Sequence, residues 1–165
     1  MRRLSLIALA TCAVLASAGV HAQQPAPQPP EYGMPITLAQ AMKVAAAAQA
    51  NSEKLGIHSV ISIVGPSGDL IYFVKMDGAQ YGSIAISQQK AKTAAIFRRP
   101  TKVFEDLVAA GGPGITALSL PGVIASAGGL PIMQGGKLVG AIGVSGAPRG
   151  VVDQESSQAG LDALK

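Results

Sequence analysis

The feature that most constrains this sequence is a glycine-rich hairpin pattern between residues 128 and 147. Two apolar runs, residues 128–132 and 138–144, flank the pair Gly135 and Gly136. Two adjacent glycines permit the positive φ angles of a tight hairpin turn. The second run contains several residues with little or no side chain, which lets a backbone, a helix or a ligand approach closely. The pattern therefore predicts an antiparallel hairpin with a neighbour packed tightly against its second strand.

The first 22 residues have the pattern of an export signal. Arg2 and Arg3 precede an apolar stretch over residues 4–15, which is short for a membrane span. Small residues at the end of the segment form a cleavage site. We therefore expect residues 1–22 to be removed, the protein to be periplasmic or secreted, and no membrane span to remain. Lipoprotein processing at Cys12 is an alternative, although the preceding Thr11 fits that signal poorly.

Residues 23–36 are rich in proline and glutamine. This composition favours an extended linker of the polyproline II type over packed structure. The rest of the chain, residues 37–165, has the length of one domain.

Cysteine and histidine are too scarce for several classes of site. Cys12 is the only cysteine and lies in the leader with His21, so the processed chain keeps a single histidine, His58. This excludes cysteine-based zinc sites, Cys–His nucleophilic pairs and multi-histidine metal cages. Arg2 and Arg3 contribute half of the formal net charge of +4, and the remaining excess is too small to predict nucleic-acid binding.

The remaining pattern alternates helices with hairpins. Helical periodicity and capping residues predict four helices, at residues 38–55, 83–97, 101–108 and 151–164. Alternating apolar runs predict strands at residues 57–64, 70–76, 124–132 and 138–144, while residues 115–120 fit either a strand or an irregular segment. Strands joined by hairpins indicate an antiparallel sheet and therefore the α+β class.

Four stretches of this sequence resemble the GlcG/HbpS heme-binding-like family, whose domain type also forms the C-terminus of PduO-type proteins. They are residues 77–79, 90–95, 128–132 and 140–147, and the likeness extends from about residue 37 to residue 164. The resemblance implies a profilin-like fold, with a five-stranded antiparallel sheet flanked by helices, and a homo-oligomer. It is less specific for function, because members include heme-binding proteins, corrinoid-associated domains and proteins without an assigned activity.

The resemblance implies an exported protein that binds heme or another tetrapyrrole, with a role in heme sensing, storage or degradation. Thr93 matches the position of a threonine implicated in contacting heme iron in this family. Its alternative role is a hydrogen bond to the carbonyl one helical turn earlier. His58 is the second candidate iron ligand because neutral imidazole commonly binds iron, although a lone histidine at a strand start is more often a surface residue.

Four other residues belong to the same hypothesis. Lys90 or Arg98 would meet the heme propionates, with an ordinary solvated surface as the alternative. Gly140 and Gly143 would let a flat macrocycle lie close to the sheet, either under the helix that carries Thr93 or between subunits.

An enzyme acting on a small organic acid is the alternative function. Asp153 would be its general base, with Lys90 or Arg98 anchoring the substrate carboxylate. Asp153 would equally serve as a structural residue at a helix start, where a carboxylate accepts backbone N–H bonds. An oligomeric accessory module without a ligand is a third possibility, so the sequence leaves open whether the protein is an enzyme.

Overall fold

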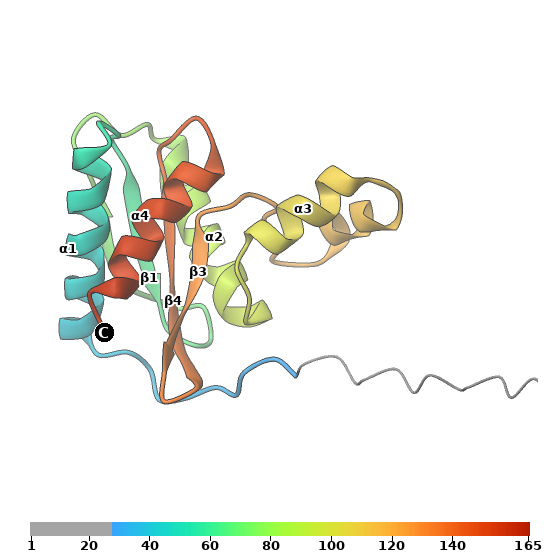
Figure 1. Cartoon of the computed structure of the whole chain (residues 1–165), viewed down its shortest axis with the longest axis horizontal. Coiled ribbons are helices and arrows are strands. Elements are labelled where there is room, and N and C mark those ends of the chain that lie inside the picture. The colour runs from blue at the N-terminus through green and yellow to red at the C-terminus, as the bar shows by residue number, and fades with distance from the viewer. Residues whose placement is uncertain (1–27) are drawn as a thin grey trace, which may run out of the picture.

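The computed structural model describes residues 28–165, so the expected export signal lies outside the described residues. A four-stranded antiparallel sheet has two helices, α1 and α4, on one face and α2 on the other (Figure 1). A further helix, α3, and a 3-10 helix, η1, project from this body as an arm. In chain order the elements are α1 (Leu38–Lys54), β1 (Val60–Val64), β2 (Leu70–Lys75), α2 (Gly82–Phe97), α3 (Lys102–Ala110), η1 (Gly112–Ser119), β3 (Gly129–Gln134), β4 (Lys137–Ser145) and α4 (Gly150–Asp162).

Local sequence signals place several element boundaries correctly. The hydroxyl of Thr37 accepts a hydrogen bond from the Gln40 N–H, and the Gln40 side chain accepts one from the Thr37 N–H, which together form a capping box at the start of α1. Gly135 and Gly136 both adopt positive φ in the turn between β3 and β4. The α+β class, the antiparallel sheet and both hairpins are confirmed.

The prediction of five strands is wrong, because the sheet has four in the order β2-β1-β4-β3. β1 ends at Val64, opposite Ala141, so the start of β4 is left without a strand on that side. The extended segment 31–36 lies there and forms a single parallel bridge between Tyr32 and Leu138. This segment is flanked by Pro30 and contains Pro35, and proline has no N–H to donate, which explains why the pairing does not continue as a strand.

Strand β3 begins at Gly129 rather than at residue 124. The backbone N–H of Ile124 donates to the Thr93 hydroxyl, and that of Ala127 donates to the Glu105 carboxylate. These amides therefore bond to side chains of α2 and α3 instead of a neighbouring strand. The undecided segment before them is the 3-10 helix η1.

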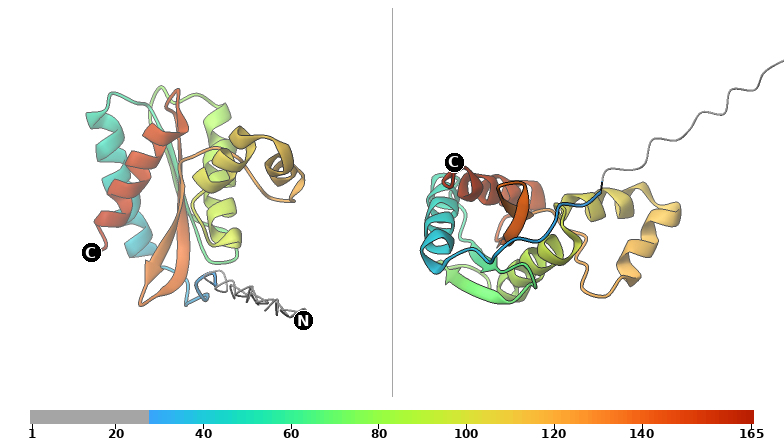
Figure 2. Two further views of the ribbon diagram at one scale, coloured as in Figure 1. Left: turned by 45° about the vertical axis from the view of Figure 1, so that its right-hand side comes forward. Right: turned by 90° about the horizontal axis from the view of Figure 1, so that it is seen from below.

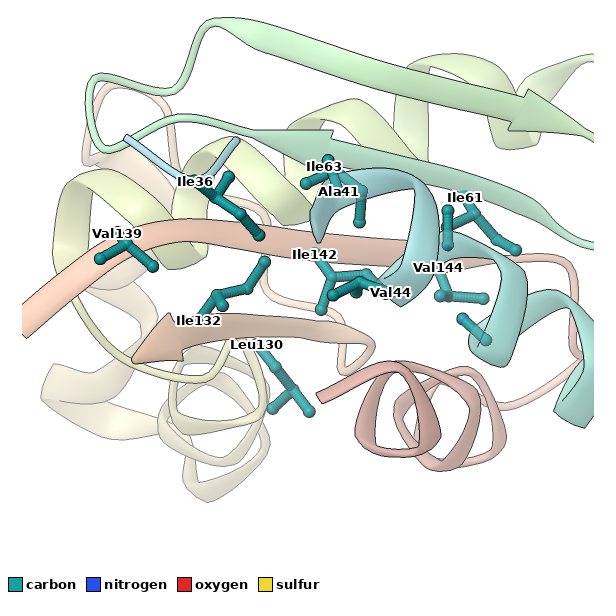
Figure 3. Packing of buried hydrophobic residues seen from close by; sticks show 12 residues of the cluster. Ile36, Ala41, Val44, Ile61, Ile63, Leu130, Ile132, Val139, Ile142 and Val144 are labelled. Carbon is teal, nitrogen blue, oxygen red and sulfur yellow. The ribbon is translucent and has the colours of Figure 1, made fainter. Parts of the chain in front are cut away.

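Aliphatic side chains fill the space between the sheet and the α1/α4 layer (Figure 3). Ile61 and Ile63 of β1 and Ile142 and Val144 of β4 point to this side, where Val44 of α1 packs against them. β1 is buried along its whole length because helices cover both faces of the sheet. This layer forms the main hydrophobic core.

Small residues form the opposite layer, between α2 and the sheet. Two serine pairs link them, Ser62 with Ser87 at 2.9 Å and Ser145 with Ser83 at 3.1 Å. A Cβ atom added to Gly143 would collide with the carbonyl oxygen of Ser87. The close approach predicted for the glycine-rich strand is therefore made by a helix backbone.

We predict that Gly143→Ala destabilises the fold, because the new methyl group meets rigid α2 backbone. Overpacking of this kind costs about 1–3 kcal/mol, measured as a lower free energy of unfolding in urea. Gly82→Ala is the matched control, since Gly82 is the first residue of α2 and a Cβ there meets nothing within 4 Å. Equal stability of the two variants would contradict the packing argument.

Candidate functional site

Three loops meet at one end of the sheet, at the top of Figure 1. They connect α1 to β1, β2 to α2, and β4 to α4, and they meet because β1 starts where its antiparallel neighbours end. A hollow of about 280 Å³ lies among them, lined by Gly56, Ile57, His58, Gly78, Gln80, Gly146 and Pro148. Glycines from all three loops contribute, so backbone forms much of its wall.

His58 is exposed at this hollow and also lines a second one of about 270 Å³. The second hollow has a different character, because its other lining residues are Gln49, Glu53, Met76 and Asp77. The imidazole thus borders both hollows, one lined by loop glycines and the other by two acidic residues. A Cβ on Gly78 would lie 3.3 Å from the imidazole Nδ1, so the backbone of the second loop packs directly against the ring.

An aromatic side chain and a cation lie next to this end of the sheet. Tyr81, adjacent in sequence to the lining residue Gln80, is 83% exposed. The Nζ atom of Lys75 lies 5.2 Å from the centroid of its ring, a cation–π contact. This end of the sheet therefore presents an imidazole, an aromatic ring and a positive charge close to one another.

A buried ion pair joins Lys90 of α2 to Asp153 of α4. Their side chains are 2% and 3% exposed, and Lys90 Nζ lies 2.8 Å from Asp153 Oδ2. Lys90 Nζ also donates to the carbonyl of Val144 at 3.1 Å. The other carboxylate oxygen, Oδ1, accepts the N–H of Ala147 at 2.8 Å. The structure thus brings these two predicted site residues together, 63 positions apart in sequence.

Burial raises the pKa of the Asp153 carboxyl, and the Lys90 ammonium opposes this shift. A raised pKa suits a general base. However, both oxygens of this carboxylate are already bonded within the protein, and a substrate would have to displace Lys90 or the Ala147 amide to reach them. The geometry fits a structural ion pair that fixes α4 and its preceding loop to α2.

Lys90 is buried and paired, so its predicted role at heme propionates would require this ion pair to open. Arg98 is also engaged, because its guanidinium lies 5.1 Å from the Tyr32 ring centroid and donates to the Pro30 carbonyl at 3.1 Å. Arg98 has a φ of 54°, and among the described residues it alone has positive φ without being glycine. This conformation ends α2 and directs the side chain to the N-terminal segment, so Arg98 fastens that segment to the domain.

Thr93 is fully buried and its hydroxyl is occupied. It donates to the Gly122 carbonyl at 2.7 Å and accepts from the Ile124 N–H at 3.1 Å. It therefore holds the chain after η1 against α2, rather than bonding one turn back along its own helix. A ligand could reach this hydroxyl only if that segment moved.

Gly140 and Gly143, which were predicted to lie against a macrocycle, face other parts of the protein in this structure. A Cβ on Gly140 would lie 2.5 Å from the Val64 carbonyl oxygen and 3.1 Å from Ile36 Cγ2, and Gly143 lies under α2. Protein atoms fill both spaces. Of the seven predicted site residues, His58 is the one whose side chain lines an open hollow.

The loop glycines around His58 could have been recognised only by topology. Gly56 and Gly78 have the positive φ typical of turns, and each is accounted for locally as a helix end or a turn. The available signal is topological. Gly56, Gly78 and Gly146 lie in loops next to strand ends, and an antiparallel sheet brings those strand ends to the same edge.

Over residues 28–165, no helix has the length and apolar character needed to cross a membrane. In the same range, no cluster of three or more histidine, cysteine, aspartate or glutamate side chains is arranged to hold a bare metal ion.

Comparison with known proteins confirms the family resemblance. A family model described as "Haem degrading protein HbpS-like" matches residues 36–162. The chain is 36% identical over 122 residues to a 15.0 kDa protein of the dhaT–dhaS intergenic region of Citrobacter freundii, covering 73% of this chain and 84% of the relative. It is 35% identical over 113 residues to protein GlcG of Escherichia coli K12, covering 67% and 82%. A crystal structure of a Streptomyces reticuli HbpS double mutant matches with a TM-score of 0.74 and 31% identity, covering 94% of this chain and 99% of that one.

We predict that Lys90→Met lowers the free energy of unfolding by about 3–5 kcal/mol at pH 7, because it leaves a buried carboxylate without its cation. The loss should shrink toward acidic pH. A carboxyl with a raised pKa holds its proton in the folded state at pH values where the unfolded chain has released it, so stability falls as pH rises through that window. Removing Lys90 raises the Asp153 pKa further, so the pH range over which stability falls extends to higher pH. Urea unfolding between pH 4 and pH 8 measures this slope.

Lys92→Met is the control for this measurement, since Lys92 lies on the same helix with its side chain exposed. It should change stability by less than about 0.5 kcal/mol at any pH. If Lys90→Met lowers the free energy of unfolding equally at pH 4 and pH 8, the charge on Asp153 is not the cause of the destabilisation.

Proposed function

The chain belongs to the HbpS-like family, and we propose that it binds heme at the glycine-lined hollow beside His58. The observation that carries the proposal is the exposed imidazole at the meeting point of three loops. The family description names heme as the molecule that a member degrades. Neutral imidazole is a common protein ligand of heme iron.

The residues at this end of the sheet fit such a ligand. A flat macrocycle needs a wall with little side-chain bulk, and Gly56, Gly78 and Gly146 contribute backbone to the wall of this hollow. A volume of about 280 Å³ is slightly below the usual range of small-molecule sites, which begins at about 300 Å³. The hollow would therefore hold one edge or face of heme and leave the rest to solvent or to another subunit.

The surroundings supply complementary chemistry for the rest of the molecule. Tyr81 is exposed enough to lie against an aromatic macrocycle. The ammonium of Lys75, above the Tyr81 ring, would neutralise a propionate. Lys75 thus takes the role that was expected of Lys90 or Arg98.

The proposal also includes export. It rests on the sequence pattern of residues 1–22, with processing that yields a periplasmic or secreted protein. An exported heme-binding protein would hold, sense or help degrade heme outside the cytoplasm.

We predict that hemin titration of the full chain gives a saturable Soret shift that depends on His58. His58→Ala should weaken binding at least about tenfold, equivalent to about 1.4 kcal/mol, and should change the spectrum because the iron loses its axial nitrogen. His21→Ala, which removes the other histidine of the sequence, is the matched control and should bind like the unaltered chain.

Thr93→Ala distinguishes the two candidate iron ligands. It should reduce stability, because Gly122 and Ile124 lose their partner, but leave the heme spectrum unchanged at temperatures where the variant is folded. A spectrum that changes with Thr93→Ala and not with His58→Ala would overturn the assignment of the site. A featureless titration of the unaltered chain would overturn heme binding itself.

A further inference from the structure

A polar hollow of about 390 Å³ lies between α2 and the turn that joins β1 to β2. Its walls come from residues 64–70 and residues 85–92, and we call it the turn hollow. The turn lies beside α2 in the views of Figure 2. Because His58 precedes β1 and the turn follows it, the turn hollow is at the opposite end of this strand from the proposed heme site.

Two opposite charges lie on different walls of the turn hollow. Asp69 of the turn and Lys92 of α2 both line it, and both side chains are exposed. Neither takes part in any ion pair of residues 28–165, so they do not pair with each other. The hollow therefore separates a carboxylate from an ammonium group, and each is left to solvent.

The turn holds both charged groups in place. The Ser67 hydroxyl donates to Asp69 Oδ2 at 2.6 Å, and the Asp69 carbonyl accepts the N–H of Gly65 at 2.9 Å. Gly68 has a φ of 89°, and a Cβ there would lie 2.9 Å from Cγ of Lys92, so the turn backbone contacts the aliphatic stem of that lysine. Within the described residues, the second carboxylate oxygen, Asp69 Oδ1, has no hydrogen-bond partner.

Gln88 adds a side-chain amide to the same wall as Lys92. It lies four positions earlier on α2, which places both side chains on one face of the helix. Its amide makes no hydrogen bond within residues 28–165, whereas that of Gln89 donates to the Gly122 carbonyl. A free amide both donates and accepts hydrogen bonds. The remaining wall is apolar and includes Leu70 and Ala85.

We propose that the turn hollow binds a free α-amino acid with an aliphatic side chain. A ligand with one charge would leave the charge on the other wall without a partner, which is costly in a filled site. An amino acid carries both charges, so its ammonium bonds to Asp69 Oδ1 and its carboxylate to Lys92 and Gln88. The apolar wall accepts the aliphatic side chain, and the volume is within the range of small-molecule sites.

The test is equilibrium dialysis of the full chain against radiolabelled L-leucine, for which we expect saturable binding. Lys92→Met and Asp69→Asn should each weaken binding at least about tenfold, because each removes one charged partner. Both side chains are exposed, so circular dichroism should show an unchanged fold. Lys43→Met is the matched control, since Lys43 is an exposed lysine of α1 on the other face of the sheet, and it should bind leucine like the unaltered chain.

Two analogues of leucine test whether both charges are needed. Isocaproate lacks the ammonium group and isoamylamine lacks the carboxylate, so each should displace labelled leucine at least about tenfold more weakly than unlabelled leucine does. Absence of saturable leucine binding would overturn the proposal. So would leucine binding that neither Lys92→Met nor Asp69→Asn weakens, or an analogue that competes as well as leucine itself.

Discussion

The Lys90 side chain contributes to the fold by joining parts that are distant in sequence. From α2 its ammonium reaches the end of β4, through the Val144 carbonyl, and the first turn of α4, through Asp153. Asp153 then fixes the loop between β4 and α4 through the Ala147 amide. That loop contributes Gly146 and Pro148 to the hollow beside His58. A single ionic contact therefore couples the packing of two helices on opposite faces of the sheet to the shape of the candidate site.

This arrangement is possible because the residues around the pair are small. A Cβ on Gly128 would lie 2.9 Å from Lys90 Nζ, and one on Gly129 would collide with the Lys90 carbonyl. The two glycines thus leave room for a long charged side chain in a layer that consists mostly of small residues. A buried pair seldom adds net stability over an apolar replacement, but removal of one partner is costly. The expected benefit is a defined arrangement of α2, α4 and the loop.

Local patterns predicted the helices and hairpins because each depends on residues close together in sequence. Thr37 with Gln40, or Gly135 with Gly136, contains its own structural signal. The prediction that the third strand starts at residue 124 is wrong for the opposite reason. The amides of Ile124 and Ala127 bond to the side chains of Thr93 and Glu105, which are distant in sequence. The candidate site shows the same division. His58 could be chosen by residue type, while the burial of Lys90, Thr93 and Gly143 depends on packing that no spacing reveals.

The fastening of the N-terminal segment has a consequence for how the domain is presented. Arg98 and the start of β4 hold residues 30–36 at one end of the sheet, whereas the loops around His58 follow the other end of β4. These ends are separated by the length of the strand, roughly 25 Å. The described part of the chain therefore begins near the end of the sheet opposite the hollow (Figure 1). The molecule is polarised along its strands, with its N-terminal segment fixed at one end of the sheet and the hollow beside His58 open at the other.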